Sequence, residues 1–283
     1  MGQGGKTFHF CDDEDDAMMS GEPLHVKTPV RDSMTLSKVA GTTVYLKMDS
    51  AQPSGSFKIR GIGHLCKTWA ERGCEHFVCS SAGNAGMAAA YAARKLGIPA
   101  TIVTLDEAVR VAKALPKNNS GWIYVPPFDD PLIWYPGAIV LAVGGGGLLC
   151  GVAQGLVEVG WGDVPIITME TIGANSFHAS TKAGKLAMKV FQEHPIFSEV
   201  VSDQEAVAAV EKFVDDEKIL VEPACGAALA AIYSNVVQKL QGEGKLCTPL
   251  SSLVVIVCGG SNISLAQLPA LKKQLGMKSG LPQ

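Results

Sequence analysis

Short hydrophobic runs alternate along this chain with longer segments in which apolar residues recur every three or four positions. The short runs predict buried strands and the longer segments predict helices. This alternation is typical of α/β proteins, in which helices connect the strands of a mostly parallel sheet. The predicted strands are 43–47, 77–79, 100–104, 122–125, 139–143, 166–170 and 253–258. The predicted helices are 59–72, 84–96, 148–159, 203–214 and 224–240.

Two connections interrupt the alternation. The strand that ends at Thr104 runs directly into residues 105–108, which begin like a helix, although strand-to-helix loops usually hold about 2 to 6 residues. The predicted strand 122–125 leads to 139–143 through a Pro-rich stretch that contains no obvious crossover helix. Parallel strands need such a crossover. We interpret both places as internal deletions.

Composition narrows the classes of partner. The 283 residues carry a formal net charge of −3, which gives no electrostatic reason to bind nucleic acid or an anionic membrane. No apolar run reaches the roughly 20 residues that span a bilayer, and the N-terminus has no secretory hydrophobic region. We therefore expect a cytoplasmic protein with a small-molecule partner. The acidic residues 12–16 predict that residues 1–20 form a disordered extension.

The eight cysteines are irregularly spaced and contain no Cys-x-x-Cys pair. This spacing argues against a zinc site. Several of these cysteines lie inside apolar runs, where cysteine behaves as a small hydrophobic residue. We therefore interpret the cysteines as reduced thiols, as is usual in a cytoplasmic protein.

The segment 53–61, Pro-Ser-Gly-Ser-Phe-Lys-Ile-Arg-Gly, places Lys58 directly after a Gly/Ser turn, where a helix is predicted to begin. A lysine that forms a Schiff base must lose its proton, and partial burial beside another cation lowers the pKa of an amine. Lys58 is thus a candidate for covalent chemistry. The alternative, which this segment alone does not exclude, is an ordinary solvated lysine.

Two further loops join a predicted strand to a predicted helix. The four glycines 144–147 let backbone N–H groups approach a phosphate at a helix N-terminus, although such a run can also be a flexible turn. A nicotinamide site is disfavoured because the run lacks the Gly-x-Gly-x-x-Gly form. The loop 79–86 offers hydroxyls, an amide and N–H groups to a carboxylate, or it simply caps a helix. A lysine, a phosphate cradle and a carboxylate cradle together indicate a pyridoxal-phosphate enzyme that acts on an amino acid.

Five motifs in this order resemble the fold type II pyridoxal-phosphate enzymes of the serine/threonine dehydratase family. They are Ser-x-Lys-x-Arg at 56–60, Ser-Ser-Ala-Gly-Asn at 80–84, the glycines 144–147, Met-Glu-Thr at 169–171, and Val-Cys-Gly-Gly-Ser-Asn at 257–262. The resemblance implies an α/β fold of the tryptophan synthase β type with two domains and mostly parallel sheets. The large domain, which binds pyridoxal phosphate, would comprise 21–61 and 126–283, and a truncated small domain 62–125.

The resemblance also implies roles for individual residues. Lys58 would carry the cofactor, Phe57 would pack against its ring, Asn84 would contact the ring hydroxyl, and Cys258 would face the ring nitrogen. The phosphate would be bound by Gly144, Gly145, Gly146, Gly147 and Leu148. The substrate carboxylate would be bound by Ser81, Ala82, Asn84 and Ala85.

The implied reaction is the dehydration and deamination of L-serine to pyruvate and ammonia, and of L-threonine to 2-oxobutyrate and ammonia, with Lys58 as the base. The family implies a cytoplasmic homodimer in amino-acid catabolism and gluconeogenesis. Serine racemases of this fold have a serine where this chain has Ala82, and a low-activity relative has glycine, so both are less favoured alternatives. A further alternative is a variant that keeps the cofactor site but is catalytically impaired by its deletions.

The family also implies a monovalent cation, K⁺, bound beside Glu170, Ala174 and Ser176. The segment that would complete this cation site is missing after Leu186, which is a third deletion. Glu170 is accordingly either a cation ligand or an ordinary carboxylate at the end of a strand.

Overall fold

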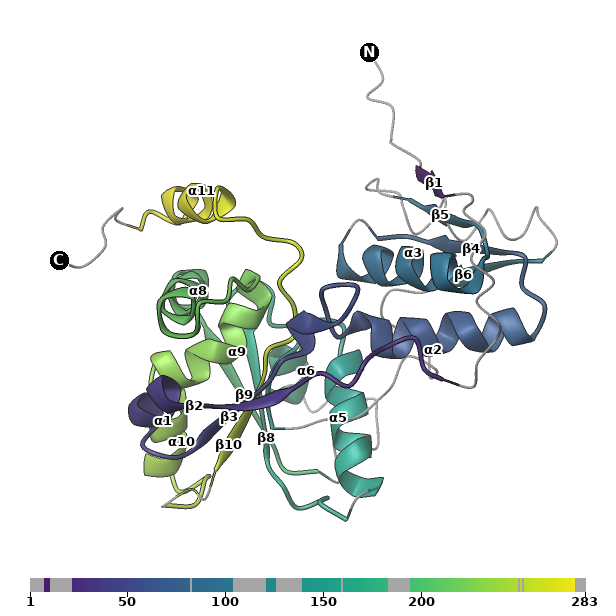
Figure 1. Ribbon diagram of the computed structural model, residues 1–283. Coiled ribbons are helices and arrows are strands. Elements are labelled where there is room, and N and C mark those ends of the chain that lie inside the picture. The colour runs from purple at the N-terminus through teal and green to yellow at the C-terminus, as the bar shows by residue number, and fades with distance from the viewer. Residues whose placement is uncertain are drawn as a thin grey trace. The chain divides into compact units, whose positions relative to one another are not determined.

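The structure is a computed structural model and describes residues 8–10, 22–81, 83–103, 121–125, 139–158, 160–182, 194–248, 250 and 252–277. The chain divides into two units (Figure 1). Unit 1 comprises Met1–Lys27 and Gln52–Trp134, and unit 2 comprises Thr28–Ala51 and Tyr135–Gln283. Each unit has a sheet of its own.

Unit 1 is built on a sheet with the strand order β1-β5-β4-β6. Its strands are β1 (Phe8–Phe10), β4 (His76–Cys79), β5 (Ala100–Ile102) and β6 (Trp122–Val125), and its helices are α2 (Lys58–Glu71) and α3 (Asn84–Leu96). β4 pairs in parallel with β5 and with β6. The core lies where the two helices meet the sheet, and it contains Ile62, Leu65, Phe77 and a series of alanines from α3. These small side chains allow α2 and α3 to pack closely.

The division of the chain differs from the predicted domains at Lys58. The sequence placed residues 21–61 in the large domain, whereas Gln52 and the residues that follow it belong to unit 1. α2 is one continuous helix from Lys58 and packs along α3. Its first turn, with Lys58, therefore stays with unit 1.

A short strand lies inside the segment that was predicted to be disordered. Phe8–Phe10 forms β1, which pairs antiparallel with β5. Aromatic residues favour strands, and without β1 the strand β5 would be an open edge of the sheet. Residues 1–7 and 11–20 of the predicted extension lie outside the described residues.

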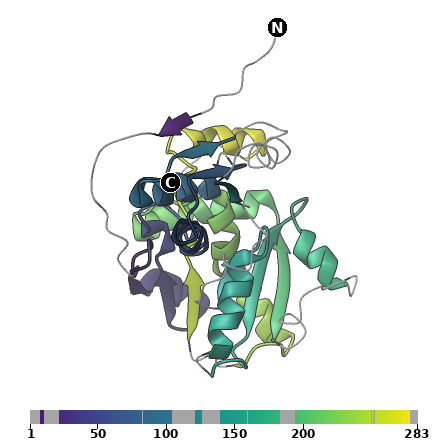
Figure 2. The ribbon, with the colours of Figure 1, turned by 90° about the vertical axis from the view of Figure 1, so that its right-hand side faces the viewer.

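Unit 2 contains a larger sheet with the strand order β2-β3-β10-β7-β8-β9. The strands are β2 (Val30–Ser33), β3 (Val44–Lys47), β7 (Val140–Ala142), β8 (Ile166–Thr171), β9 (Ile196–Val201) and β10 (Leu253–Ile256). The helices are α1 (Met34–Ala40), α5 (Gly147–Glu158), α6 (Ser176–Lys182), α8 (Asp203–Glu217), α9 (Pro223–Tyr233), α10 (Val236–Gly242) and α11 (Gln267–Gln274), with a 3-10 turn η1 (Asp49–Ala51). Only β2 pairs antiparallel in this sheet. Figure 2 shows α5 beside the strands.

α9 is the central helix of unit 2. Every residue from Cys225 to Ile232 is buried, because α9 lies between the sheet and the helices α8, α1 and α10. A helix that is apolar on all sides is stable only in such an environment. At Gly226 the backbones of α9 and α8 come so close that an added Cβ would lie 2.3 Å from the carbonyl oxygen of Ala206.

The single helix predicted for 224–240 is wrong in one respect. α9 ends at Tyr233, α10 begins at Val236, and Asn235 between them has a φ of 57°. Asparagine adopts this left-handed conformation more readily than most residues. The apolar periodicity continues through the break because both helices bury a face, so the sequence pattern did not reveal it.

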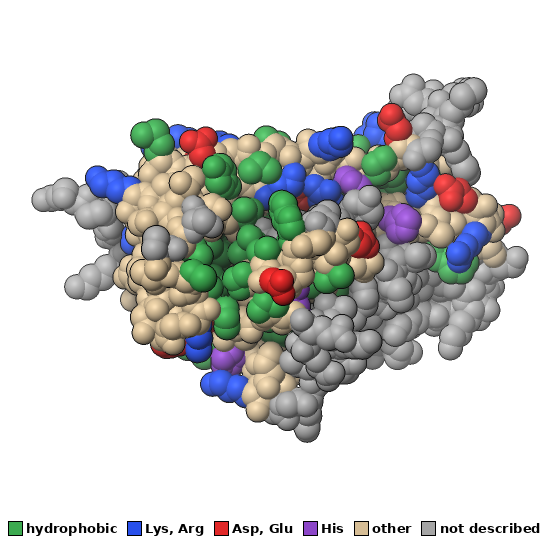
Figure 3. Space-filling view, turned by 90° about the horizontal axis from the view of Figure 1, so that it is seen from below, with side chains coloured by type: hydrophobic (Ala, Val, Ile, Leu, Met, Phe, Trp, Pro, Cys, Tyr) green, Lys and Arg blue, Asp and Glu red, His purple; other side chains and the backbone are tan. Residues whose placement is uncertain are grey.

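Hydrophobic side chains also gather in one region of the described surface (Figure 3). The large apolar residues that are more than half exposed are Val30, Met34, Val157, Trp161, Ile172 and Leu265.

Of the helices in the described part of the chain, none is long and apolar enough to cross a membrane.

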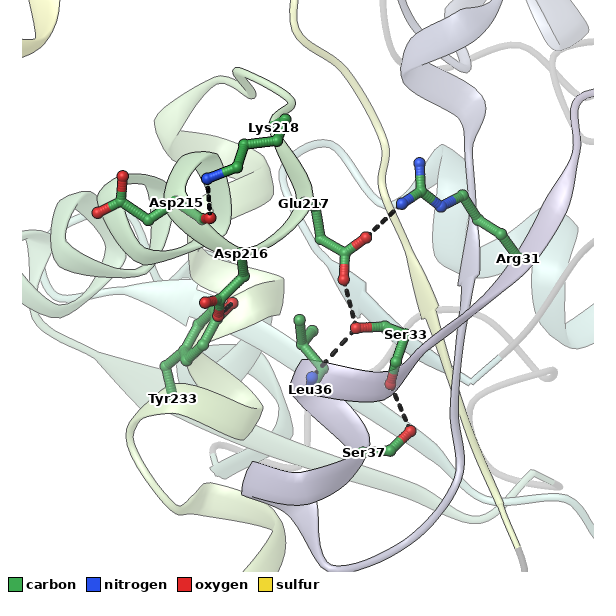
Figure 4. Close-up of polar contacts among 9 residues, drawn as sticks. All are labelled: Arg31, Ser33, Leu36, Ser37, Asp215, Asp216, Glu217, Lys218 and Tyr233. Carbon is green, nitrogen blue, oxygen red and sulfur yellow. Dashed lines mark hydrogen bonds and ion pairs between the residues drawn. The ribbon is translucent and has the colours of Figure 1, made fainter.

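Glu217, the last residue of α8, connects that helix to β2 and α1 through hydrogen bonds (Figure 4). Glu217 accepts hydrogen bonds from Arg31 and from the Ser33 hydroxyl, both at 2.5 Å. Ser33 in turn caps α1 by accepting the N–H of Leu36 at 3.1 Å. Beside this contact, the Tyr233 hydroxyl donates to Asp216 at 2.6 Å and ties α8 to α9. These contacts join segments that are far apart in the sequence.

Replacing Gly226 with alanine tests the close packing of α9 on α8. Because the added Cβ would clash with backbone atoms, we expect Gly226→Ala to lower the free energy of unfolding by about 2 kcal/mol or more. Gly242→Ala is the matched control, since its Cβ meets nothing within 4 Å, and it should be neutral or stabilising by up to about 1 kcal/mol. Urea unfolding of the two variants measures the difference. Equal midpoints would contradict the packing described.

Candidate functional site

Lys58 is the first residue of α2, as the sequence predicted. The chain reaches it through a tight turn in which Gly55 has a φ of 75° and donates its N–H to the carbonyl of Gln52 at 2.7 Å. The residue before α2, Phe57, makes no side-chain capping hydrogen bond to the helix. The Lys58 Nζ lies 5.3 Å from the centroid of the Phe57 ring. The lysine is thus held over an aromatic face at a helix N-terminus.

A buried hydroxyl lies two residues before Lys58. Ser56 is fully buried, and among the residues that the structure describes its Oγ has no hydrogen-bond partner. Leaving a buried hydroxyl unpaired costs about 1–3 kcal/mol. A ligand with a polar group near Lys58 would satisfy this atom, and the observation therefore fits a bound cofactor or substrate here.

The serine loop, residues 80–83, leads from β4 into α3. The Gly83 N–H donates to the Ser81 Oγ at 3.3 Å, and no side chain caps α3. An added Cβ at Gly86 would lie 2.0 Å from the Ser81 carbonyl oxygen, so only glycine allows the loop to fold against the helix. Asn84 and Ala85 form the first turn of α3, where N–H groups favour an anion. Ala82, a predicted contact of the carboxylate, lies outside the described residues.

Cys79 connects this loop with Lys58. It is the buried last residue of β4 and directly precedes Ser80. Burial raises the pKa of Cys79 to about 12, although the charge of Lys58 lowers it in part. The thiol therefore stays protonated, and its interaction with Lys58 shows that the lysine and the serine loop lie near each other within unit 1.

The four glycines join β7 to α5 in unit 2. Gly146 has a φ of 86°, and an added Cβ at Gly144 or Gly146 would meet nothing within 4 Å. The loop therefore faces open space, where a phosphate could approach backbone N–H groups at the start of α5. Gly147 and Leu148 begin the helix, as predicted within one residue. These residues fit a phosphate-bearing cofactor.

Cys258 lies just beyond β10 at the same edge of the unit 2 sheet. β10 pairs in parallel with β7, so the carboxyl ends of both strands, and hence Cys258 and the glycine loop, lie on one side. A hydrogen bond with Cys225, burial and the nearby Glu222 raise the pKa of the Cys258 thiol well above its usual value. Cys258 is therefore a neutral thiol. Unit 2 thus brings the glycine loop and Cys258 together at the carboxyl edge of its sheet, and in unit 1 the serine loop follows the carboxyl end of β4.

Glu170 has partners that compete with a cation. Its two carboxylate oxygens accept the N–H groups of Phe177, at 3.0 Å, and His178, at 2.7 Å, in the first turn of α6. Glu170 lies near the end of β8, Ser176 begins α6 and Ala174 lies in the connection between them, and the described residues contain no group of three or more His, Cys, Asp or Glu that could hold a metal ion. These residues fit a helix cap better than a cation site, and K⁺ stays a prediction.

Sequence reasoning missed Ser56, Cys79 and Cys225 as parts of the site. Ser56 and Cys79 stand inside the quoted motifs, so their position next to Lys58 and Ser80 was an available signal. Cys225 lies 33 residues before Cys258 in an apolar helix, and nothing in the sequence marks the pair. Only the folded unit brings these two thiols together.

The family profile described as "Pyridoxal-phosphate dependent enzyme" matches residues 22–105 and 135–259. The chain belongs to this family. It is 73% identical to the L-serine dehydratase/L-threonine deaminase of Bos taurus, over 94% of this chain and all of the bovine protein. It is 67% identical to the human protein of the same name, with the same coverage. The crystal structure of the fungal L-serine ammonia-lyase from Rhizomucor miehei superimposes with a TM-score of 0.78 at 33% identity, covering 89% of this chain and 99% of that one. The fold of a type II pyridoxal-phosphate enzyme is thereby confirmed.

The comparisons also bear on the predicted deletions. The alignment with the bovine protein runs over 328 positions, whereas this chain has 283 residues, so the relative contains segments that this chain lacks. The family profile stops at residue 105 and resumes at residue 135. The first limit lies next to Thr104 and the second lies within the Pro-rich stretch 126–138, which are the two places where the predicted alternation is interrupted. The adjoining residues 104–120 and 126–138, and residues 183–193 around Leu186, lie outside the described residues.

The glycine loop provides a test of cofactor binding. Gly146→Ala introduces strain at a positive φ and places a Cβ in front of the loop, and we expect the affinity for pyridoxal phosphate to fall about tenfold or more. Gly160→Ala is the matched control, because Gly160 has a φ of 77° and equally open space but lies at the other end of α5. Equilibrium dialysis gives both dissociation constants. If the two variants bind the cofactor equally well, this loop is not the phosphate site.

Proposed function

We propose that this chain is a pyridoxal-phosphate-dependent lyase that converts L-serine to pyruvate and ammonia, and L-threonine to 2-oxobutyrate and ammonia. The relatives at 73% and 67% identity are named for both substrates, and this chain is aligned with them over most of its length. The observation that carries the proposal is the position of Lys58 at the start of α2, close to Cys79 and the serine loop that follows it.

The predicted site residues would each have a role in holding the cofactor. Lys58 would bind it covalently, Phe57 would pack on its ring, and Asn84 and Cys258 would contact the ring hydroxyl and nitrogen. The phosphate would be bound at Gly144, Gly145, Gly146, Gly147 and Leu148. When bound, pyridoxal phosphate supplies an electron sink for the negative charge that develops at the substrate Cα.

Lys58 would act as the base that removes the Cα proton of the substrate. The amine of Lys58 must be neutral for this step. A neighbouring anion would stabilise its charged ammonium form and so raise the pKa of the lysine. Cys79, with its pKa raised to about 12, contributes no such anion near neutral pH. The thiol therefore fills space beside the lysine without stabilising the ammonium form.

The serine loop and the first turn of α3 would bind and orient the substrate carboxylate. Ser81 and Asn84 offer a hydroxyl and an amide, and Ala85 offers a backbone N–H at the helix N-terminus. Ala82 offers no acid or base to the opposite face of the substrate. This difference disfavours racemisation.

Cys258 would hold its proton on Sγ and donate it only as a hydrogen bond. A neutral thiol is a poorer proton donor than the carboxylic acid that faces the ring nitrogen in other pyridoxal-phosphate folds. Cys258 would therefore offer the ring nitrogen a hydrogen bond but no proton, and the cofactor would withdraw negative charge from the substrate Cα less completely. Loss of the β-hydroxyl is then favoured over transamination.

We also propose that the enzyme is located in the cytoplasm and forms a homodimer. A cytoplasmic location is supported by the cysteines of the described residues, which are free thiols.

A homodimer is supported by the hydrophobic region in Figure 3, since such regions often mark contacts between proteins. Size-exclusion chromatography with light scattering tests the dimer, and a monomeric mass would contradict it.

Pyruvate release from L-serine tests the proposed reaction. With added pyridoxal phosphate, we expect the wild type to release pyruvate and Lys58→Ala to lose about 10³-fold or more in kcat. Lys67→Ala is the matched control on the same helix, where the Lys67 ammonium donates to the carbonyl of Glu22 at 2.8 Å. Lys67→Ala should keep wild-type activity.

Two outcomes count against the proposal. If Lys58→Ala keeps the wild-type rate, Lys58 is not the base. If the wild type binds the cofactor but neither protein forms pyruvate, the chain is a catalytically impaired member of the family.

A further inference from the structure

The turn that leads into α2 is held in place by its own polar groups. The side-chain amide of Gln52 donates to the Val26 carbonyl at 2.9 Å and accepts the Val26 N–H at 3.0 Å. The Gly55 N–H donates to the Gln52 carbonyl at 2.7 Å, and the Ser54 hydroxyl donates to the Ser56 carbonyl at 3.4 Å. The backbone that carries Ser56 is therefore fixed within unit 1.

Ser56 differs from the other buried polar side chains of this turn. Gln52, Ser54 and Ser56 are all buried, and the side chains of the first two have partners in the protein. Within the described part of the chain, the Ser56 Oγ has none. Buried polar side chains are nearly always paired, so an exception indicates a partner that the protein itself does not supply. Two kinds of group can supply it, a trapped water molecule or a bound ligand.

The position of Ser56 beside Lys58 favours a ligand. One residue separates them, so their Cα atoms lie within about 7.6 Å of each other. Pyridoxal phosphate is joined to a lysine through its aldehyde carbon, and the ring positions on either side carry the hydroxyl and the phosphate-bearing methylene group. Oxygen atoms thus flank the carbon that Lys58 would hold. A trapped water needs two to four polar partners, whereas the Gln52 amide and the Ser54 hydroxyl are already engaged.

We propose that Ser56 is a cofactor-binding residue, whose hydroxyl donates a hydrogen bond to an oxygen of the pyridoxal phosphate held at Lys58. The inference rests on the proposed function, because it takes Lys58 as the residue that carries the cofactor. Without the cofactor, the Ser56 hydroxyl is buried and unpaired, which lowers stability, and with the cofactor it is paired, which adds to affinity. Removing this hydroxyl therefore has opposite effects on the stability of the cofactor-free protein and on cofactor binding.

The test measures both effects in the full chain. Ser56→Ala removes the hydroxyl, and Ser56→Cys keeps a side chain of similar volume with a much weaker donor. Ser54→Ala is the matched control, because Ser54 is a buried serine of the same turn whose hydroxyl is already paired with the protein. The readouts are the melting temperature without cofactor and the dissociation constant of pyridoxal phosphate from equilibrium dialysis. The double variant Ser56→Ala/Lys58→Ala, beside Lys58→Ala, asks whether Ser56 contacts the cofactor itself.

We expect Ser56→Ala to weaken the binding of pyridoxal phosphate about five- to tenfold. The same variant should leave the melting temperature of the cofactor-free protein unchanged or raise it by about 2 to 4 °C. Ser56→Cys should weaken binding to a similar extent, whereas Ser54→Ala should keep the wild-type affinity and should not raise the melting temperature. In the Lys58→Ala background, Ser56→Ala should weaken the remaining non-covalent binding by a similar factor.

Three outcomes would overturn the inference. The first is a wild-type affinity in Ser56→Ala, which leaves a trapped water as the partner; if the alanine variant does not fold, a wild-type affinity in Ser56→Cys decides the matter equally. The second is a clear fall in the melting temperature of cofactor-free Ser56→Ala, since the hydroxyl would then be paired in the empty protein. The third is an effect on affinity that disappears in the Lys58→Ala background, because Ser56 would then act on the lysine.

The failure of the proposed reaction is distinguishable from the failure of this inference. A wild type that binds the cofactor but releases no pyruvate refutes the reaction alone, since the dissociation constants still test Ser56. A wild type that binds no cofactor refutes both.

Discussion

Parallel pairing of neighbouring strands determines where the candidate site residues lie. In unit 1, β4 runs parallel to β5 and β6, and the serine loop follows its carboxyl end. In unit 2, β7 and β10 are parallel neighbours, so the glycine loop and Cys258 emerge at one edge. A ligand site at the carboxyl ends of parallel strands is the general arrangement in open α/β sheets. Within each sheet, residues that are distant in the sequence reach the same edge because neighbouring strands run in the same direction.

The polar groups at these edges are mostly neutral or paired within the protein. Cys79 and Cys258 keep their protons, because burial raises the pKa of each and a hydrogen bond with Cys225 adds to the effect at Cys258. The Glu170 carboxylate is satisfied by the N–H groups of α6. The groups predicted to bind a charged, phosphate-bearing ligand are the backbone N–H groups of the glycine loop and Lys58. Neutral thiols and a paired carboxylate suit a cofactor that brings its own negative charge and its own electron sink.

Local signals made part of this architecture predictable. The helix from Asn84 to Leu96 was predicted to the residue, because the Ser-Ser-Ala-Gly-Asn turn precedes it and Gly97 ends it in a left-handed conformation. Lys58 was recognised through the turn around Gly55 and the predicted start of α2. In each case the residues that fix the backbone are adjacent in the sequence.

Other features depend on contacts that the sequence does not reveal. The short, largely exposed strand β2 gave no apolar signal, and it is held by pairing with β3 and by the contact of Arg31 with Glu217. The pairing of Cys225 with Cys258 arises only when α9 packs against β10. Asn235 breaks a helix inside a continuous apolar pattern, so periodicity alone could not place that boundary.

Lys58 would carry the cofactor in a chain that is shorter than its relatives. The most direct measurement is reduction of the cofactor-loaded protein with sodium borohydride, followed by proteolysis and mass spectrometry of the peptides. We expect one reduced pyridoxyl-phosphate adduct, located on the peptide that contains Lys58. An adduct on another lysine, or none on a folded and soluble protein, would contradict it.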